Sequence, residues 1–87
     1  MQKTHVVKVT FGAKYKKDDI LHAEGNITYK NENFLWIAKE SHYGLGWEVE
    51  IHDNGKISPK DAEFLKAAIS SSIDRNVVET QYKLIIE

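Results

Sequence analysis

Residues 58–76 read SPKDAEFLKAAISSSIDRN, and this stretch carries the clearest helix signal in the 87-residue chain. Ser58 is a suitable N-cap, Pro59 suits the first helical position, and Asp61 stands three residues after the cap, as in a capping box. Asn76 suits the left-handed residue that ends many helices. One broad half of the predicted helix is apolar, with Ala62, Phe64, Leu65, Ala68, Ile69 and Ile73.

Upstream of this helix, apolar and polar residues alternate with a period of two, which is the pattern of half-buried strands. Four such runs are predicted, over residues 7–15, 21–29, 34–39 and 47–52. Polar turns are expected after the first, second and fourth runs, at residues 16–19, 31–33 and 53–55. In the first run, one face is expected to hold Val7, Val9, Phe11, Ala13 and Tyr15, and the other face Lys8, Thr10 and Lys14. In the second run, the apolar face is expected to hold Leu21, Ala23, Gly25, Ile27 and Tyr29.

Downstream of the helix, residues 78–86 alternate in the same way and predict a fifth strand. The chain is therefore predicted to be a single α+β domain over residues 1–87. It would form an antiparallel sheet of about five strands with one helix packed on one face, in the order ββββαβ. The last strand could pair with the first or the fourth, and we favour the first.

The third run differs from the others because it is apolar on both faces. Phe34, Trp36 and Ala38 share one face, and Leu35 and Ile37 share the other. A strand of this kind is normally covered on both sides. One helix about 10 Å across also looks too narrow for the apolar face of five strands. Strong coiling of the sheet, self-association or a docked protein would each cover the remainder.

The segment that follows the third run is a candidate interaction site. Its two glycines allow sharp backbone turns, and Tyr and Trp are favoured anchors at protein interfaces. Two acidic residues then occupy one face of the fourth run. The residues predicted to bind a partner are His42, Tyr43, Leu45, Trp47, Glu48 and Glu50. The alternative is a hairpin loop whose aromatic side chains fold back onto the sheet.

The composition of the chain restricts the cellular compartment and the class of binding partner that we expect. The chain has no cysteine and a net charge of −1, and no apolar stretch approaches the roughly 20 residues that span a bilayer. We therefore expect a cytoplasmic protein without membrane contact. Residues 1–17 hold five lysines and no acidic residue. Nucleic-acid binding is thus an alternative function, disfavoured by the single arginine, and it would use Lys8, Lys14, Lys16 and Lys17.

The sequence does not predict catalytic chemistry. The four histidines have no local spacing typical of a metal site, and the glycines at 44 and 46 lack the lysine and helix of a phosphate loop. We expect no catalytic residues, no metal and no cofactor. A small enzyme or ligand carrier stays a third alternative.

The leading hypothesis is therefore a non-enzymatic protein-binding module. Its residue usage, rich in Lys, Asn, Ile and Asp, indicates an AT-rich genome. Small compact chains without catalytic groups are typical of the inhibitors or regulators by which phages or bacteria occlude another protein, such as a host defence factor. The expected partner is another protein, and a homodimer is an alternative.

Overall fold

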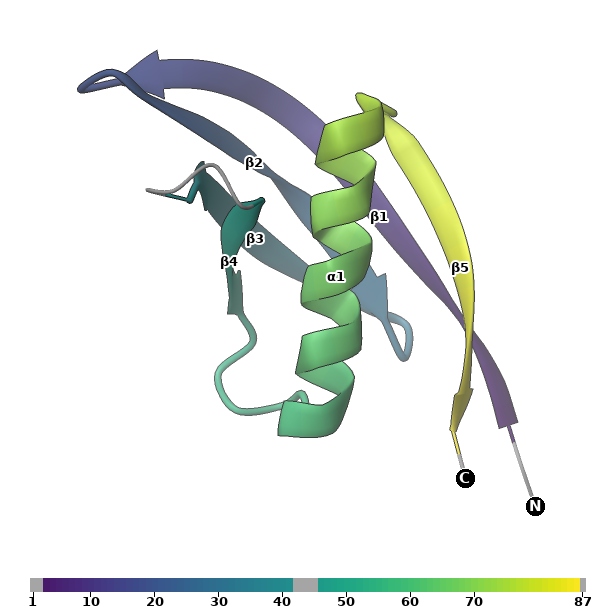
Figure 1. The fold of residues 1–87 in the computed structure, drawn as a ribbon. Coiled ribbons are helices and arrows are strands. Elements are labelled where there is room, and N and C mark those ends of the chain that lie inside the picture. The colour runs from purple at the N-terminus through teal and green to yellow at the C-terminus, as the bar shows by residue number, and fades with distance from the viewer. Residues whose placement is uncertain (1–2, 42–45, 87) are drawn as a thin grey trace.

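The computed structural model describes residues 3–41 and 46–86, and it contains a five-stranded antiparallel sheet with one helix (Figure 1). The elements are β1 (Lys3–Lys17), β2 (Ile20–Tyr29), β3 (Glu32–Glu40), β4 (Trp47–His52), α1 (Pro59–Arg75) and β5 (Glu79–Ile86). The strand order in the sheet is β4-β3-β2-β1-β5. The predicted α+β fold is confirmed, and the last strand pairs with the first, as favoured.

Both hairpin turns of the β1–β2–β3 meander use two residues with positive φ. Asp18 and Asp19 (φ 54° and 63°) connect β1 to β2, and Lys30 and Asn31 (φ 50° and 64°) connect β2 to β3. Two successive positive φ values match the right-handed twist of the flanking strands. The second turn, predicted at residues 31–33, therefore begins one residue earlier and ends two residues earlier, because β3 already begins at Glu32.

The ends of α1 follow the local signals in the sequence. The Ser58 hydroxyl accepts a hydrogen bond from the Asp61 backbone N–H at 3.3 Å, and Pro59 occupies the first turn. Asn76 adopts the left-handed conformation, and its N–H donates to the Ile73 carbonyl at 3.0 Å. These contacts satisfy backbone groups that have no partner inside the helix.

The core lies between α1 and the inner face of the sheet, which is the face that α1 covers (Figure 1). Of the three alternatives for covering this face, coiling of the sheet around α1 is the one that the described residues show (Figure 1). The sheet curls around α1, and strand twist makes this curling easy. The buried core consists of Val7, Val9, Phe11, Ala23, Ile27, Tyr29, Phe34, Trp36, Ala38, Ile57, Leu65, Ala68, Ile69 and Ile73.

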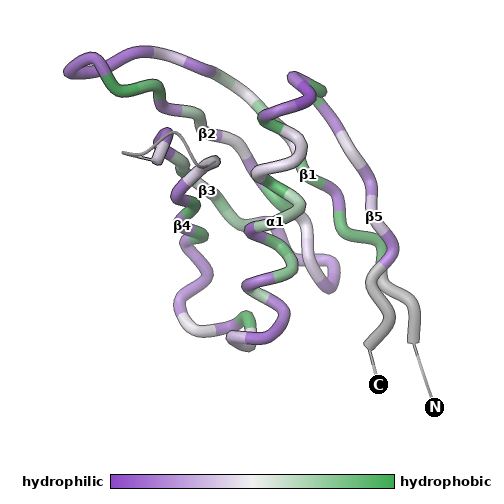
Figure 2. Tube along the Cα trace, in the orientation of Figure 1, coloured by the Kyte–Doolittle hydropathy of each residue, from purple (hydrophilic) through white to green (hydrophobic). Residues whose placement is uncertain are grey.

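A β-bulge at Gly12 divides β1 into two halves. Odd-numbered residues face the core before the bulge, and even-numbered residues lie on the inner face after it. Phe11 pairs with Gly25, but Ala13 pairs with the next residue back, Glu24. The extra residue shifts the alternation, because neighbouring side chains in a strand point to opposite faces. Figure 2 shows the half of β1 nearest the turn as mostly hydrophilic.

The predicted assignment of the β1 side chains to the two faces of the sheet is consequently wrong for the residues after Gly12. Lys14 lies opposite the inner-face residue Ala23, and Tyr15 lies opposite the outer-face residue His22. The Lys14 amine is 5.9 Å from the centre of the Phe11 ring. A lysine therefore continues the inner face where sequence alternation expected an aromatic ring, and its charge lies over the edge of the core.

The centre of the sheet depends on Gly25. Its cross-strand neighbours are Phe11 in β1 and Trp36 in β3, and their rings stack with centroids 6.4 Å apart. The Trp36 indole also donates a hydrogen bond to the Asn26 carbonyl at 3.0 Å. A glycine leaves room for the indole to lie over the backbone of β2 and reach Phe11.

The buried Tyr29 hydroxyl donates a hydrogen bond to the Asp61 carboxylate and links β2 to the first turn of α1. Burial, followed by this hydrogen bond and the negative charge of Asp61, raises the pKa of Tyr29 to about 12. The pKa of an unfolded tyrosine is about 10. The folded state therefore binds the proton more tightly than the unfolded state does.

We expect the contribution of Tyr29 to stability to be fully present below about pH 10 and to be lost as pH rises through about 12. Over that window the free energy of unfolding should fall by roughly 2–3 kcal/mol because of this one group. The Tyr29→Phe variant should be less stable at neutral pH and lack this part of the alkaline decline. Urea unfolding of both proteins across the window measures the difference, and parallel declines would contradict the prediction.

Candidate functional site

The structure describes three of the six residues predicted to bind a partner. His42, Tyr43 and Leu45 lie outside the described residues. Trp47, Glu48 and Glu50 all belong to β4, the edge strand next to β3. Glu48 and Glu50 share the outer face of the sheet, which is the face away from α1, with Lys39 and Ile37 of β3.

Trp47 belongs to the other side of β4. Its indole is partly buried against the core, and its Nε1 donates a hydrogen bond to the Asp74 carboxylate in the last turn of α1 at 2.9 Å. The Lys14 amine lies 5.8 Å from the centre of its ring. These contacts connect the start of β4 to α1 and to the β1 hairpin, so Trp47 does not share a surface with Glu48 and Glu50.

The four lysines considered for nucleic-acid binding also fall on different faces. Lys8 lies on the outer face and forms an ion pair with Glu79 of β5 at 2.8 Å. Lys14 and Lys16 lie on the inner face, because of the bulge at Gly12, and Lys17 pairs with Ile20 at the outer side of the turn. A surface that follows a phosphate backbone needs its cations on one side.

The outer face carries exposed apolar side chains in the middle of the sheet. Leu35 and Ile37 of β3 are 46 % and 37 % exposed, although β3 has a neighbouring strand on each side. The two residues point to one face at a spacing of two, as alternation predicted. The expectation that this face of β3 is also covered is wrong in the part of the chain that the structure describes.

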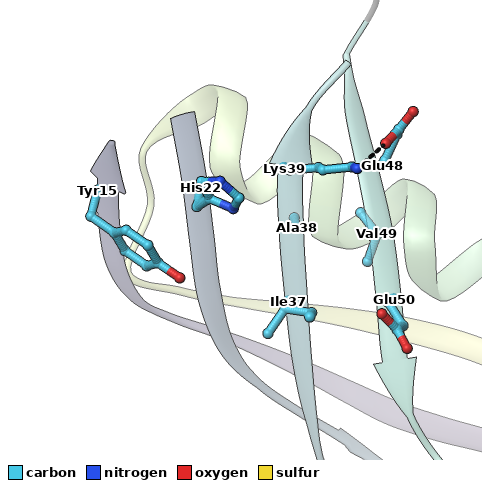
Figure 3. A pocket seen from close by; sticks show the side chains of 8 residues that line it. All are labelled: Tyr15, His22, Ile37, Ala38, Lys39, Glu48, Val49 and Glu50. Carbon is cyan, nitrogen blue, oxygen red and sulfur yellow. Dashed lines mark ion pairs between the residues drawn. The ribbon is translucent and has the colours of Figure 1, made fainter. Parts of the chain in front are cut away.

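A shallow hollow of about 380 Å³ lies beside these residues on the outer face. It crosses four strands, from Tyr15 and His22 to the Lys39–Glu48 ion pair and Glu50 (Figure 3). The Tyr15 and His22 rings stack with centroids 5.4 Å apart and planes within 9°. The hollow therefore combines a stacked pair of rings, the Ile37 side chain and a charged margin.

The charges around the hollow are paired across and along the strands. Lys39 and Glu48 face each other at 3.5 Å, and the His52 ring lies 3.8 Å from the Glu50 carboxylate. Among the residues that the structure describes, no side chain that lines the hollow is a serine, threonine or cysteine. No group of three potential metal ligands occurs among the residues the structure describes. Nor does any described helix have the length and apolar character needed to cross a membrane.

Sequence reasoning missed most of this surface. Leu35 and Ile37 were assigned to the correct face, but they were expected to be covered and were not treated as site residues. Tyr15 was missed because the bulge at Gly12 reverses its direction. The available signal for the bulge was the glycine in each of the two neighbouring strands, Gly12 in β1 and Gly25 in β2, since bulges often contain glycine.

Comparisons with protein-family models, with curated proteins and with solved structures find no match to this chain. Its function is therefore inferred from the surfaces described above.

Proposed function

We propose that this chain is a non-enzymatic protein-binding module that docks a partner protein on its outer-face patch, defined as Leu35 and Ile37 together with the adjoining hollow. One observation carries the proposal, namely that two large apolar side chains stand exposed side by side in the interior of the sheet. Apolar groups clustered on a surface commonly mark an interaction site, whereas scattered ones do not.

The composition of the patch supports this function. Protein interfaces combine an apolar centre, depleted of charge, with a polar rim. Here Leu35 and Ile37 form the centre, and the rim is polar, with the charged residues Glu24, Lys39, Glu48 and Glu50 and the imidazole of His52. Tyr15 adds an aromatic anchor next to the centre, and tyrosine is enriched among the residues that dominate binding energy.

The charges of the rim indicate the chemistry of the partner. Acidic residues outnumber lysine around the hollow, and both glutamates that line it, Glu48 and Glu50, belong to the edge strand β4. A partner that presents an apolar surface flanked by basic side chains would complement it, and charge complementarity would raise the association rate. Occlusion of the partner in the cytoplasm, as phage or bacterial inhibitors act, is the corresponding mode of action.

The proposal is tested with the immobilised full chain and lysate of its source or host cells. We expect one partner to be retained in stoichiometric amount by the natural protein and lost from the Ile37→Glu variant. Removal of a central apolar contact typically costs about 2 kcal/mol or more, which corresponds to roughly thirtyfold weaker binding.

The matched control is Val6→Glu, because Val6 is also an exposed apolar residue on the outer face but lies at the other end of β1. This variant should keep the partner. Equal thermal melting curves for the two variants would show that both are folded. Failure to retain any stoichiometric partner, or loss of it from Val6→Glu but not from Ile37→Glu, would contradict the proposal.

A further inference from the structure

The free edge of β5 is a second candidate interaction surface, because backbone N–H and C=O groups along it have no hydrogen-bond partner in another described strand. The Phe11 N–H donates to the Val78 carbonyl at 2.8 Å, so the backbone groups of residues 78, 80 and 82 point toward β1. Backbone groups in antiparallel strands alternate in direction, and those of Glu79, Gln81 and Lys83 therefore point away from the sheet. Among the described residues no strand pairs with this edge.

Exposed apolar residues lie beside the same edge. Val78, at the start of β5, is 67 % exposed, and Phe64 of α1 is 39 % exposed. Phe64 contacts the Tyr82 ring edge-to-face, with centroids 6.5 Å apart. An open strand edge next to uncovered apolar side chains is the arrangement that natural sheets usually avoid or use for pairing.

We propose that β5 pairs in antiparallel orientation with β5 of a second copy, and that the two sheets join into one continuous ten-stranded sheet. The two copies would be related by a twofold axis next to Gln81, which lies opposite Gln81 of the second copy. Glu79 would lie opposite Lys83 of the second copy, and Lys83 opposite its Glu79. Each of these pairs would exchange two backbone hydrogen bonds, since all of these residues direct their backbone groups outward.

Charge selects this register among those that satisfy the backbone. The two nearest registers place Glu79 or Lys83 opposite Gln81 and form no ion pair between them, and larger shifts place Glu79 opposite Glu79 or Lys83 opposite Lys83. Like charges directly opposite each other destabilise a strand pair, and opposite charges stabilise it. Only the register centred on Gln81 joins both acids to both lysines. Lys8, which contacts Glu79 at 2.8 Å, would add a second cation to each junction.

The other sheet edge does not offer this complementarity. β4 has six residues, and Glu48 and Glu50 stand on the same face. Pairing of β4 with itself would bring acidic side chains of the two copies together. Pairing of β4 with β5 of another copy would not close, and it would build filaments instead of a dimer.

The proposed dimer is independent of the proposed function. β5 pairs with residues Lys3 to Thr10 of β1, whereas the outer-face patch lies on β3 and β4 and reaches β1 only at Tyr15, in the other half of that strand. A twofold axis perpendicular to the sheet keeps both helices on one side and leaves both patches free on the other. The dimer would therefore present two copies of the binding surface, and its absence would not affect the partner experiment.

The test uses the full chain and measures solution mass across a wide concentration series. We expect the natural protein to form a dimer and the variants Lys83→Glu and Glu79→Lys each to be monomeric at concentrations at which the natural protein is dimeric. An equal mixture of the two variants should form a heterodimer, because each acid again meets a lysine. Lys66→Glu makes the same charge change on the exposed face of α1 and should leave the dimer intact.

Gln81→Pro supplies an independent variant. Proline removes the outward N–H of an edge strand without removing a hydrogen bond to β1, so the fold should persist while the dimer is lost. A natural protein that stays monomeric at every concentration would overturn the proposal. So would filament growth, a mixture that stays monomeric, or a dimer unaffected by Gln81→Pro.

Discussion

Replacing Gly25 by alanine should destabilise the protein by at least about 3 kcal/mol, because the site has no room for a single methyl group. A Cβ atom at this position would meet the carbonyl oxygen of Thr10 in β1 and would lie 2.8 Å from the Trp36 ring. The first of these is a backbone atom, so a change of rotamer cannot relieve the contact. β1 and β2 would have to separate at the point where Phe11 and Trp36 stack. The free energy of unfolding from urea titration measures the effect.

Gly12→Ala is the matched control for this change. A Cβ atom on Gly12 would meet only the Glu24 carbonyl oxygen, at 3.4 Å, which is an ordinary contact. Gly12 has no positive φ that would strain an alanine. This variant should therefore stay within about 1 kcal/mol of the natural protein. Equal losses in the free energy of unfolding for the two variants would show that the close approach of β1 and Trp36 to Gly25 is not the reason why alanine destabilises the protein there.

Trp36→Ala should cost about 3–5 kcal/mol, which is the usual range for removing a large aromatic side chain from a core. The Trp36 side chain is fully buried and stacks on Phe11. Its loss would leave a cavity and an unmatched carbonyl at Asn26. Because small domains are stable by only about 5–15 kcal/mol, much of the total would be lost. Thermal and urea unfolding measure it.

Leu35→Ala is the control for Trp36→Ala, because it tests whether the loss of stability comes from the burial of the side chain or from its position in β3. Leu35 adjoins Trp36 in β3 but points to the exposed outer face. We expect its truncation to change the free energy of unfolding by less than about 1 kcal/mol. A loss comparable to that of Trp36→Ala would mean that the outer face is covered in solution, and this result would itself require a partner or a second copy on that face.

Features set by neighbouring residues were predictable from the sequence. Ser58, Pro59 and Asn76 define the ends of α1 through contacts within one turn of the chain, and the structure confirms all three. The alternation in β2, β3 and β4 likewise identifies their inner and outer faces. In each case the decisive interaction joins residues close in sequence, so the pattern alone contains it.

Features set by distant strands were not predictable. The bulge at Gly12 depends on the partner strand, because Gly25 lets the backbone of β1 approach closely at Thr10. Gly12 and Gly25 are compatible with a bulge, but the sequence does not show which strand holds the extra residue, and the predicted directions of Lys14 and Tyr15 were therefore wrong. Tyr15 was missed as a member of the outer-face patch for the same reason, because it reaches that face only through the bulge, whereas Leu35 and Ile37 were missed because they were expected to be covered.

The position of β1 between β2 and β5 has a consequence for how the chain folds during translation. β1 is translated before the other described elements, yet one of its two edges waits for β5, which is translated after them. Until β5 arrives, the amides of β1 around Val7 and Val9 have no partner on that side, although β1 to β4 and α1 are already complete. The nascent chain is then most exposed to misassociation, and holdase chaperones would act on this interval.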